Sequence, residues 1–203
     1  MRQRILCFLI LMVSFSCKTL QKDESNVVRK TSDFFYSTFY KQANVQVPDK
    51  DWDPLLAPYA SQFVSDAAAI GVIIPQSTID MLKLFIYTDN MSVPVDPGVM
   101  AACTRYYTYE LQGGEEVKVK WMNIEVLRKE SAIFTQGQQP LLKELLYHEL
   151  FHCFMDKGHL PAPYNGIMSP TLDSNNQAVF TNFSGLFQEM FSPQFMQLTP
   201  NAS

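Results

Sequence analysis

The sequence predicts an α+β fold: a small twisted mixed sheet, an N-terminal helix, a long helix that carries an H-E-x-x-H motif, and a small C-terminal subdomain with a final helix. The chain has 203 residues, of which 47% are hydrophobic and 18% charged, so it can bury one sizeable core. Its middle part alternates at period two around a pair of glycines. Helical spacing dominates on both sides of that part.

The first helix is expected after an irregular entry that prolines punctuate. Tyr59 and Phe63 begin a pattern at helical spacing, and Gly71 follows it as a glycine cap. The apolar run over residues 81–87 then predicts a strand. Two prolines within residues 91–98 predict a loop.

A β-hairpin is expected next. Residues 103–111 and 117–127 carry β-branched and aromatic residues at near period two. They flank Gln112-Gly113-Gly114, and a glycine pair between two such runs favours a tight turn.

The most regular helical pattern lies between Pro140 and Gly158. Pro140 suits the first turn of a helix, and apolar residues recur at helical spacing after it. Gly158 is expected to end the helix, with Lys157 in its last turn. A final apolar helix is expected over residues 184–191.

The beginning of the chain has the shape of an export signal. Arg2 and Arg4 precede an apolar run over residues 5–15, which is too short to span a bilayer. Cys17 stands where a lipoprotein signal places its lipidated cysteine, which predicts a membrane anchor. The alternative is ordinary cleavage after the small-x-small pattern of residues 14–16, which yields a soluble secreted or periplasmic protein.

Three regions follow from this signal. Residues 1–16 are assigned to the signal peptide, residues 17–52 to a lipidated N-terminus and tether, and residues 53–203 to the folded domain. The aromatic run over residues 34–40 is expected to form a short element that packs on the domain.

Charge and cysteine usage limit the partners and the compartment. With 16 Lys and Arg against 20 Asp and Glu, the net charge is -4, so no cationic surplus exists to hold a phosphate backbone. We therefore expect no nucleic-acid partner. Export leaves Cys103 and Cys153 in an oxidising compartment, where they form either one disulfide or two separately buried thiols.

The three histidines of the chain fall within twelve consecutive residues. His148 and His152 are four residues apart on the expected helix, so both imidazoles project from one face and can bind one metal ion. His159 lies just past the expected helix end, where a chain reversal can bring it to the same ion. Neutral imidazole is a good zinc ligand, so the pattern predicts a three-histidine zinc site.

Glu149 lies beside the face that carries the histidines. A zinc ion with three protein ligands and one open position lowers the pKa of its bound water to about 7. Glu149 can take the proton from that water as it attacks a carbonyl and deliver the proton to the leaving amine. The pattern therefore predicts that Glu149 is the catalytic residue.

Other ligand sets remain open at the level of sequence. The histidines can line a helix face and a surface loop without any metal. Glu189 on the final helix can replace His159 as the third ligand. Cys153 can be a fourth ligand, although its place next to His152 points its side chain away from the histidine face.

Three further residues are candidates for supporting roles. Tyr164 can donate a hydrogen bond to a developing oxyanion. Asp156 or Asp173 can orient a metal-binding imidazole. Each is also compatible with a purely structural or solvated position.

The sequence of His148, Glu149, His152 and His159 resembles the metzincin class of zinc peptidases. In that class a third histidine follows H-E-x-x-H, and a methionine turn lies beneath the metal. Residues 167–170, Ile-Met-Ser-Pro, are similar to that turn. The resemblance implies that Met168 is not a ligand and forms an apolar floor under the histidines.

The string H-E-L-F-H-C resembles more closely a group of uncharacterised bacterial lipoproteins that share H-E-x-x-H-C and a later I-M-x-P. A cysteine also precedes the hairpin in that group, where this sequence has Cys103. Two differences from metzincins are the six residues between His152 and His159, where five are usual, and Met155 in place of a glycine. The resemblance implies that an extended peptide pairs with a sheet edge, for which residues 118–127 are the candidate.

The predicted function is an exported zinc-dependent metallopeptidase of the cell envelope, anchored to the membrane through Cys17, which hydrolyses peptide or protein substrates. The alternative from a different class is a non-catalytic surface or periplasmic lipoprotein, in which the zinc is structural or the chain is a partner-binding module. Catalytic zinc keeps an exchangeable water, whereas structural zinc has four protein ligands.

Overall fold

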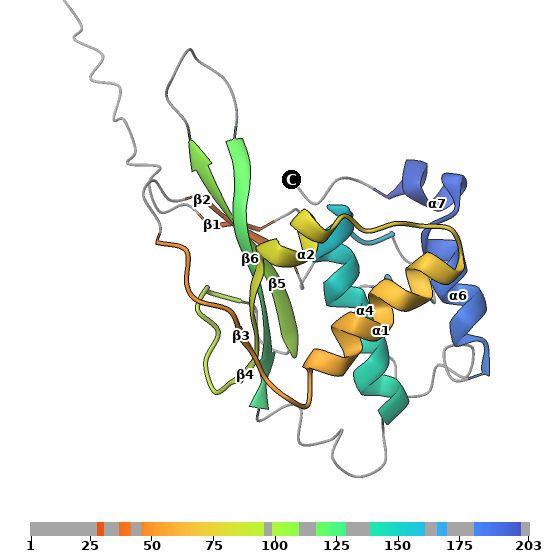
Figure 1. Ribbon diagram of the computed structural model, residues 1–203, viewed down its shortest axis with the longest axis horizontal. Coiled ribbons are helices and arrows are strands. Elements are labelled where there is room, and N and C mark those ends of the chain that lie inside the picture. Colours follow the sequence, from red (N-terminus) through yellow and green to blue (C-terminus); the bar gives the residue numbers. More distant parts are fainter. Residues whose placement is uncertain are drawn as a thin grey trace, which may run out of the picture.

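The computed structural model describes residues 28–30, 37–41, 46–95, 99–109, 117–128, 139–160, 166–169 and 181–199. The predicted signal peptide, Cys17 and the expected hairpin turn at residues 112–114 lie outside these ranges. Figure 1 shows a sheet with helices packed along one of its faces. The α+β fold class is confirmed at this level.

The described residues form a sheet of six strands in the order β1-β2-β5-β6-β4-β3. Their bounds are β1 (Val28–Lys30), β2 (Ser37–Lys41), β3 (Asp51–Trp52), β4 (Leu82–Thr88), β5 (Ala101–Tyr109) and β6 (Val117–Leu127). Strands β5 and β6 pair antiparallel, as the hairpin pattern predicts. Strand β4 pairs parallel with β6, and β2 pairs parallel with β5, so the sheet is mixed.

The expectation that residues 118–127 form a sheet edge is wrong. They belong to β6, which lies inside the sheet between β5 and β4. The hairpin pattern specifies one antiparallel pair and leaves open what pairs with its other side, because parallel strands come from segments that are distant in sequence. Strands β1 and β3 are the outer strands of the described sheet.

Three strands, β1, β2 and β3, lie within residues 17–52, which the sequence indicates as a lipidated N-terminus and tether. Strand β2 overlaps the aromatic run over residues 34–40, and its Ser37 is paired with Cys103 of β5. Strand β1 pairs antiparallel with β2. Residues 28–30 and 37–41 therefore belong to the sheet.

The core lies between the sheet and the helices α1 (Ala57–Ala69) and α4 (Gln139–Met155), which Figure 1 shows on the same side of the sheet. Phe63 of α1 is fully buried at the centre of an aromatic cluster. Its ring centroid lies 5.1 Å from that of Tyr147 in α4 and 5.3 Å from that of Phe187 in α6 (Phe183–Met190). Burying a side chain of this kind contributes about 1.5–3 kcal/mol, so the cluster fixes α4 against α1.

Both predicted main helices are present, but one of the two predicted caps is wrong. Gly71 follows α1 with a φ of 83°, as expected for a glycine cap. Helix α4 ends at Met155, before Gly158, and the left-handed residue there is Asp156, with a φ of 55°. Aspartate tolerates this conformation better than most residues, because its short polar side chain can form local hydrogen bonds.

Two short helices were not expected from the sequence, α2 (Gln76–Met81) and α7 (Pro193–Leu198). Each has six residues, which is too few for a periodic pattern to stand out. A signal for α7 is nevertheless present, because Ser192 caps it by accepting a hydrogen bond from the Phe195 N–H and Pro193 starts it.

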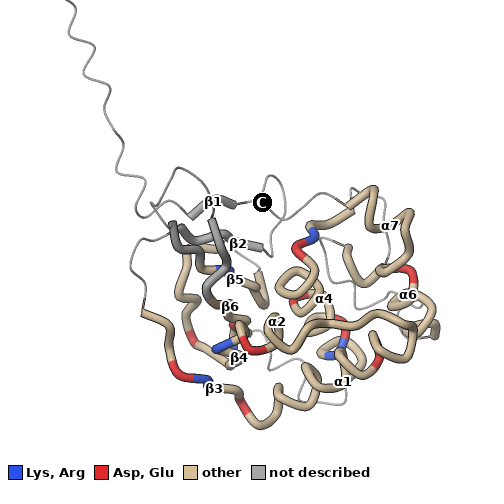
Figure 2. The backbone as a smooth tube through the Cα atoms, turned by 45° about the horizontal axis from the view of Figure 1, so that its top comes forward, with Lys and Arg blue, Asp and Glu red and all other residues tan. Residues whose placement is uncertain are grey.

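Figure 2 shows acidic and basic positions interspersed along the described elements. Among the described residues, none of the helices has both the length and the apolar character needed to cross a membrane.

Candidate metal site

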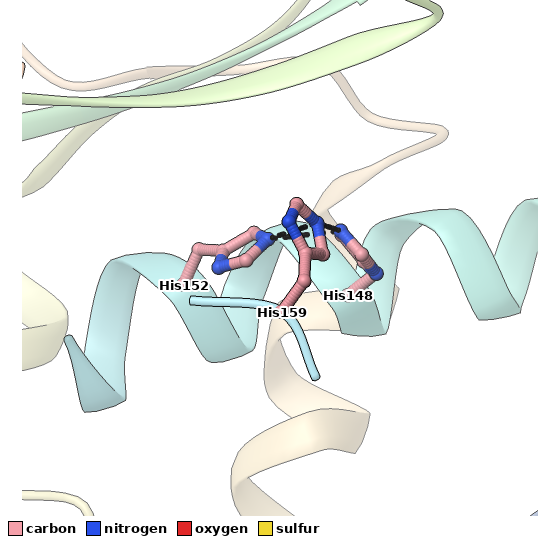
Figure 3. Close-up of side chains that lie close together, drawn as sticks. All are labelled: His148, His152 and His159. Atoms are coloured by element: carbon pink, nitrogen blue, oxygen red, sulfur yellow. Dashed lines mark hydrogen bonds between the residues drawn. The ribbon is translucent and has the colours of Figure 1, made fainter. Parts of the chain in front are cut away.

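The three histidines converge in the structure (Figure 3). His148 and His152 project from one face of α4, and His159 reaches them from the segment that follows the helix. The Nε2 atoms of His148 and His152 are 2.9 Å apart, those of His152 and His159 are 3.1 Å apart, and those of His148 and His159 are 2.7 Å apart. All three side chains are buried.

Backbone carbonyls set the orientation of two of the rings. Nδ1 of His148 lies 2.6 Å from the carbonyl oxygen of Ile167, and Nδ1 of His152 contacts the carbonyl oxygen of Lys157. A carbonyl oxygen only accepts hydrogen bonds, so each Nδ1 carries the proton. In the neutral imidazole Nε2 then has a free lone pair, which is the form that binds a metal.

The environment keeps these imidazoles neutral. Burial lowers the pKa of His148 from 6.5 to about 4, against the opposing effect of its hydrogen bond to Ile167. Burial also lowers the pKa of His152 well below 6.5, and the neighbouring His148 and Arg105 add to this decrease. The pKa of His159 is lowered by burial and by the two other histidines.

The Nε2 lone pairs of His148 and His152, with the Nε2 atom of His159 beside them, fit a bound cation. Two neutral Nε2 atoms that both lack a proton cannot hydrogen-bond to each other, so their approach is favourable only around a positive centre. Two nitrogens at about 2.0–2.1 Å from one tetrahedral zinc ion lie roughly 3.3 Å apart, which is a few tenths of an ångström more than observed. Among the described residues, this is the one group of three or more His, Cys, Asp or Glu side chains that can hold a metal ion.

Glu149 is next to this group on α4 and is fully buried. Its Oε2 accepts a hydrogen bond from the backbone N–H of Cys103 in β5, at 2.7 Å. Its Oε1 has no hydrogen-bond partner among the described residues. Burial raises the pKa of Glu149 well above 4.5, although the Cys103 N–H opposes this increase. One oxygen is therefore held by the sheet, and the other is available to a bound group.

Cys103 and Cys153 form a disulfide, with their Cα atoms 5.7 Å apart. Of the two alternatives left open by the sequence, the disulfide is the one present. Cys153 is consequently not a metal ligand, since its sulfur is bonded to Cys103. The disulfide joins α4 to β5 one residue after His152 and at the residue whose N–H holds Glu149.

The turn expected at residues 167–170 is present in its described part. The N–H of Ser169 donates to the carbonyl oxygen of Gly166 at 2.9 Å, and Met168 inside this turn is fully buried. The neighbouring Ile167 carbonyl is the one that orients His148. The turn therefore supports the histidine group through the backbone of Ile167, while Met168 packs in the core.

Of the remaining candidates, the two that the structure describes, Asp156 and Glu189, are not part of the histidine group. Asp156, one of the two carboxylates that could orient an imidazole, forms an ion pair with Arg105 instead, and its side chain is 44% exposed. The groups that orient His148 and His152 are backbone carbonyls. Every residue has such a carbonyl, so the sequence does not indicate which ones face the histidines. Glu189 is exposed on α6 and does not belong to the histidine group. Tyr164 and Asp173 lie outside the described residues.

Sequence reasoning missed Arg105. This residue is buried in β5 and binds the C-terminal end of α4, on which His152 lies. The available signal was a single charged residue inside an otherwise apolar and aromatic strand, because buried arginines in a sheet usually have a specific partner.

Comparison with known proteins adds no relative. No protein family, no curated protein and no solved structure matches this chain significantly.

Proposed function

We propose that the protein is a zinc-dependent metallopeptidase. The observation that carries this proposal is the convergence of three histidine Nε2 atoms beside a buried carboxylate, one oxygen of which has no hydrogen-bond partner among the described residues. Histidine-only sites with three protein ligands are typical of catalytic zinc. The resemblance of H-E-x-x-H and I-M-S-P to metzincins supports the same reaction class.

In this proposal the residues of the chain have separate roles. His148, His152 and His159 bind the metal through Nε2. A bound zinc ion polarises a carbonyl and lowers the pKa of a coordinated water to about 7. Glu149 would accept at Oε1 the proton of the water molecule that attacks the scissile carbonyl, and it would deliver that proton to the leaving amine as the C–N bond breaks. The N–H of Cys103 holds the other oxygen, which aims the carboxylate.

Export and anchoring belong to the same proposal. Arg2, Arg4, the apolar run over residues 5–15 and Cys17 support a lipoprotein of the cell envelope. The disulfide between Cys103 and Cys153 agrees with an oxidising compartment. The substrates are then peptides or proteins outside the cytoplasm.

A second function, a structural zinc site in a non-catalytic lipoprotein, is favoured by one observation. The three histidines and Glu149 are all at least 96% buried, since their exposed fractions do not exceed 4%. A peptidase must admit a peptide to its metal, whereas a structural metal needs no access for a substrate. The two functions differ in whether a small metal-binding inhibitor can reach the ion.

The deciding experiment compares the wild type with Glu149→Gln after zinc reconstitution, on a mixed peptide library. We expect both proteins to hold zinc equally, and hydrolysis by the variant to fall by about 10²–10⁴-fold, since a general base contributes about that much. Glu189→Gln, an exposed change of the same kind on α6, is the control and keeps wild-type activity. Zinc-loaded wild type that cleaves nothing and binds no hydroxamate would establish the structural function instead.

A further inference from the structure

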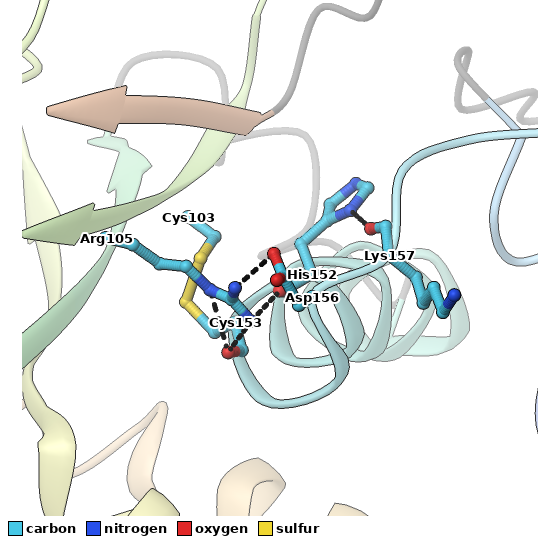
Figure 4. A network of polar contacts seen from close by, with 6 residues as sticks. All are labelled: Cys103, Arg105, His152, Cys153, Asp156 and Lys157. Atoms are coloured by element: carbon cyan, nitrogen blue, oxygen red, sulfur yellow. Dashed lines mark hydrogen bonds and ion pairs between the residues drawn. A yellow bond between two sulfur atoms is a disulfide. The ribbon is translucent and has the colours of Figure 1, made fainter. Parts of the chain in front are cut away.

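Arg105 is a buried cation whose side chain points to the C-terminal end of α4 (Figure 4). It is 5% exposed, on the same β5 strand as Cys103. Its Nε donates to the carbonyl oxygen of Cys153 at 3.1 Å, and its Nη2 donates to that oxygen at 2.6 Å and to the carbonyl oxygen of His152 at 3.0 Å. Its Nη1 forms an ion pair with the carboxylate of Asp156.

Two of the acceptors of Arg105 are carbonyl oxygens at the C-terminal end of α4. The last four carbonyls of an α-helix have no intrahelical donor, and the negative end of the helix dipole lies there. At this end of α4 the carbonyl of Cys153 accepts two hydrogen bonds from Arg105, and the carbonyl of His152 accepts one from Arg105 and one from the Asp156 N–H at 3.2 Å. A buried guanidinium is costly unless it is paired, and this geometry gives it three partners, two backbone carbonyls and one carboxylate.

Arg105 binds residues 152, 153 and 156, a stretch that contains His152 and that His159 follows closely. Asp156 has a φ of 55°, so the chain reverses at this residue and returns His159 towards α4 three positions later. The next residue, Lys157, provides the carbonyl that orients the ring of His152. The ion pair of Asp156 with Arg105 connects this reversal to β5. The Nζ of Lys157 connects it to α7, because it donates to the carbonyl of Met196 at 3.0 Å.

We propose that Arg105 is a positioning residue of the metal site: by binding the end of α4 and the Asp156 turn together, it sets the geometry in which His152 and His159 meet one ion. This inference rests on the metal site of the proposed function but not on peptide hydrolysis. A lysine does not replace the arginine, because an ammonium group lacks the planar fork that reaches two carbonyls and a carboxylate at once.

The test measures zinc affinity, by competition with a chelator, and the visible spectrum of the cobalt-substituted protein. Arg105→Lys keeps the charge and removes the fork. Asp156→Asn removes the ion pair, and asparagine accepts the left-handed backbone. The ion pair between Arg128 and Asp89, whose side chains are 62% and 79% exposed, gives matched controls in Arg128→Lys and Asp89→Asn.

We expect Arg105→Lys and Asp156→Asn each to weaken zinc binding by about 10–100-fold and to change the cobalt spectrum, as losses of supporting groups around metal ligands do. The two controls keep the wild-type affinity. If Arg105→Lys does not fold, the zinc affinity of Asp156→Asn tests the inference instead. The Asp156 side chain is 44% exposed, so this substitution leaves the core intact.

Wild-type zinc affinity and an unchanged cobalt spectrum in the folded variants would overturn the inference, even if their thermal stability were reduced. Zinc-loaded wild type without peptidase activity would overturn the proposed reaction and leave the role of Arg105 standing. Wild type that binds no zinc would overturn both.

Discussion

At the scale of single residues, the site is built from protonation states that the backbone imposes. His148 and His152 each donate a hydrogen bond from Nδ1 to a backbone carbonyl, and burial keeps their rings neutral. The sequence spacing predicts which histidines meet, because i and i+4 positions share a helix face. It cannot predict the carbonyls of Ile167 and Lys157 that turn the rings, since these depend on where two loops pack.

The histidine pKa values predict how the stability of the metal-free protein depends on pH. In the unfolded chain His148 titrates near 6.5, whereas its folded pKa is about 4. As the pH falls below 6.5 the unfolded state takes up protons that the folded state does not, so the free energy of unfolding decreases. His152 and His159 act in the same direction, while the raised pKa of Glu149 opposes them.

Urea unfolding of the metal-free protein between about pH 7 and pH 5 measures this effect. We expect the free energy of unfolding to fall over this range, by up to about 1.4 kcal/mol per pH unit for each such histidine. His148→Gln should have a shallower dependence, because one titrating group is missing. Stability that is constant or rises towards pH 5 would contradict the neutral, buried state of the histidines.

At the scale of elements, β5 and α4 form the framework of the site. Strand β5 contacts α4 through the disulfide at Cys103, through the N–H of the same residue to Glu149, and through Arg105. The sequence predicts both elements, because Pro140 and the apolar spacing define one and the period-two pattern defines the other. It does not predict the end of α4. A glycine usually takes the left-handed position after a helix, so the sequence indicates Gly158, whereas Asp156 takes that position in the structure.

Removing the disulfide tests this framework. The bond closes a loop of 50 residues, and the chain-entropy relation gives about 4 kcal/mol for that length. We therefore expect Cys103→Ala combined with Cys153→Ala to lower the free energy of unfolding by about 2–4 kcal/mol, measured by urea unfolding. Reduction of the wild type should produce a similar loss. A loss well under about 1 kcal/mol would show that the other β5 contacts to α4 suffice.

At the scale of the whole molecule, local patterns predict the fold class and miss the strand order. The α+β class follows from two helical stretches around a hairpin, each readable from a short window. The position of β6 inside the sheet depends on parallel pairing with β4, which joins residues far apart in the chain. The strands β1 and β2, from a stretch that reads as a tether, show the same limit.

The most direct test of the account is the zinc content and affinity of the reconstituted wild type against His159→Ala. His159 is the ligand that lies outside α4, so it distinguishes a three-histidine site from two histidines that share a helix face. We predict about one zinc per chain in the wild type, and loss or strong weakening of binding in the variant. A wild type that holds no zinc, or a variant that holds zinc as tightly as the wild type, would contradict the three-histidine site.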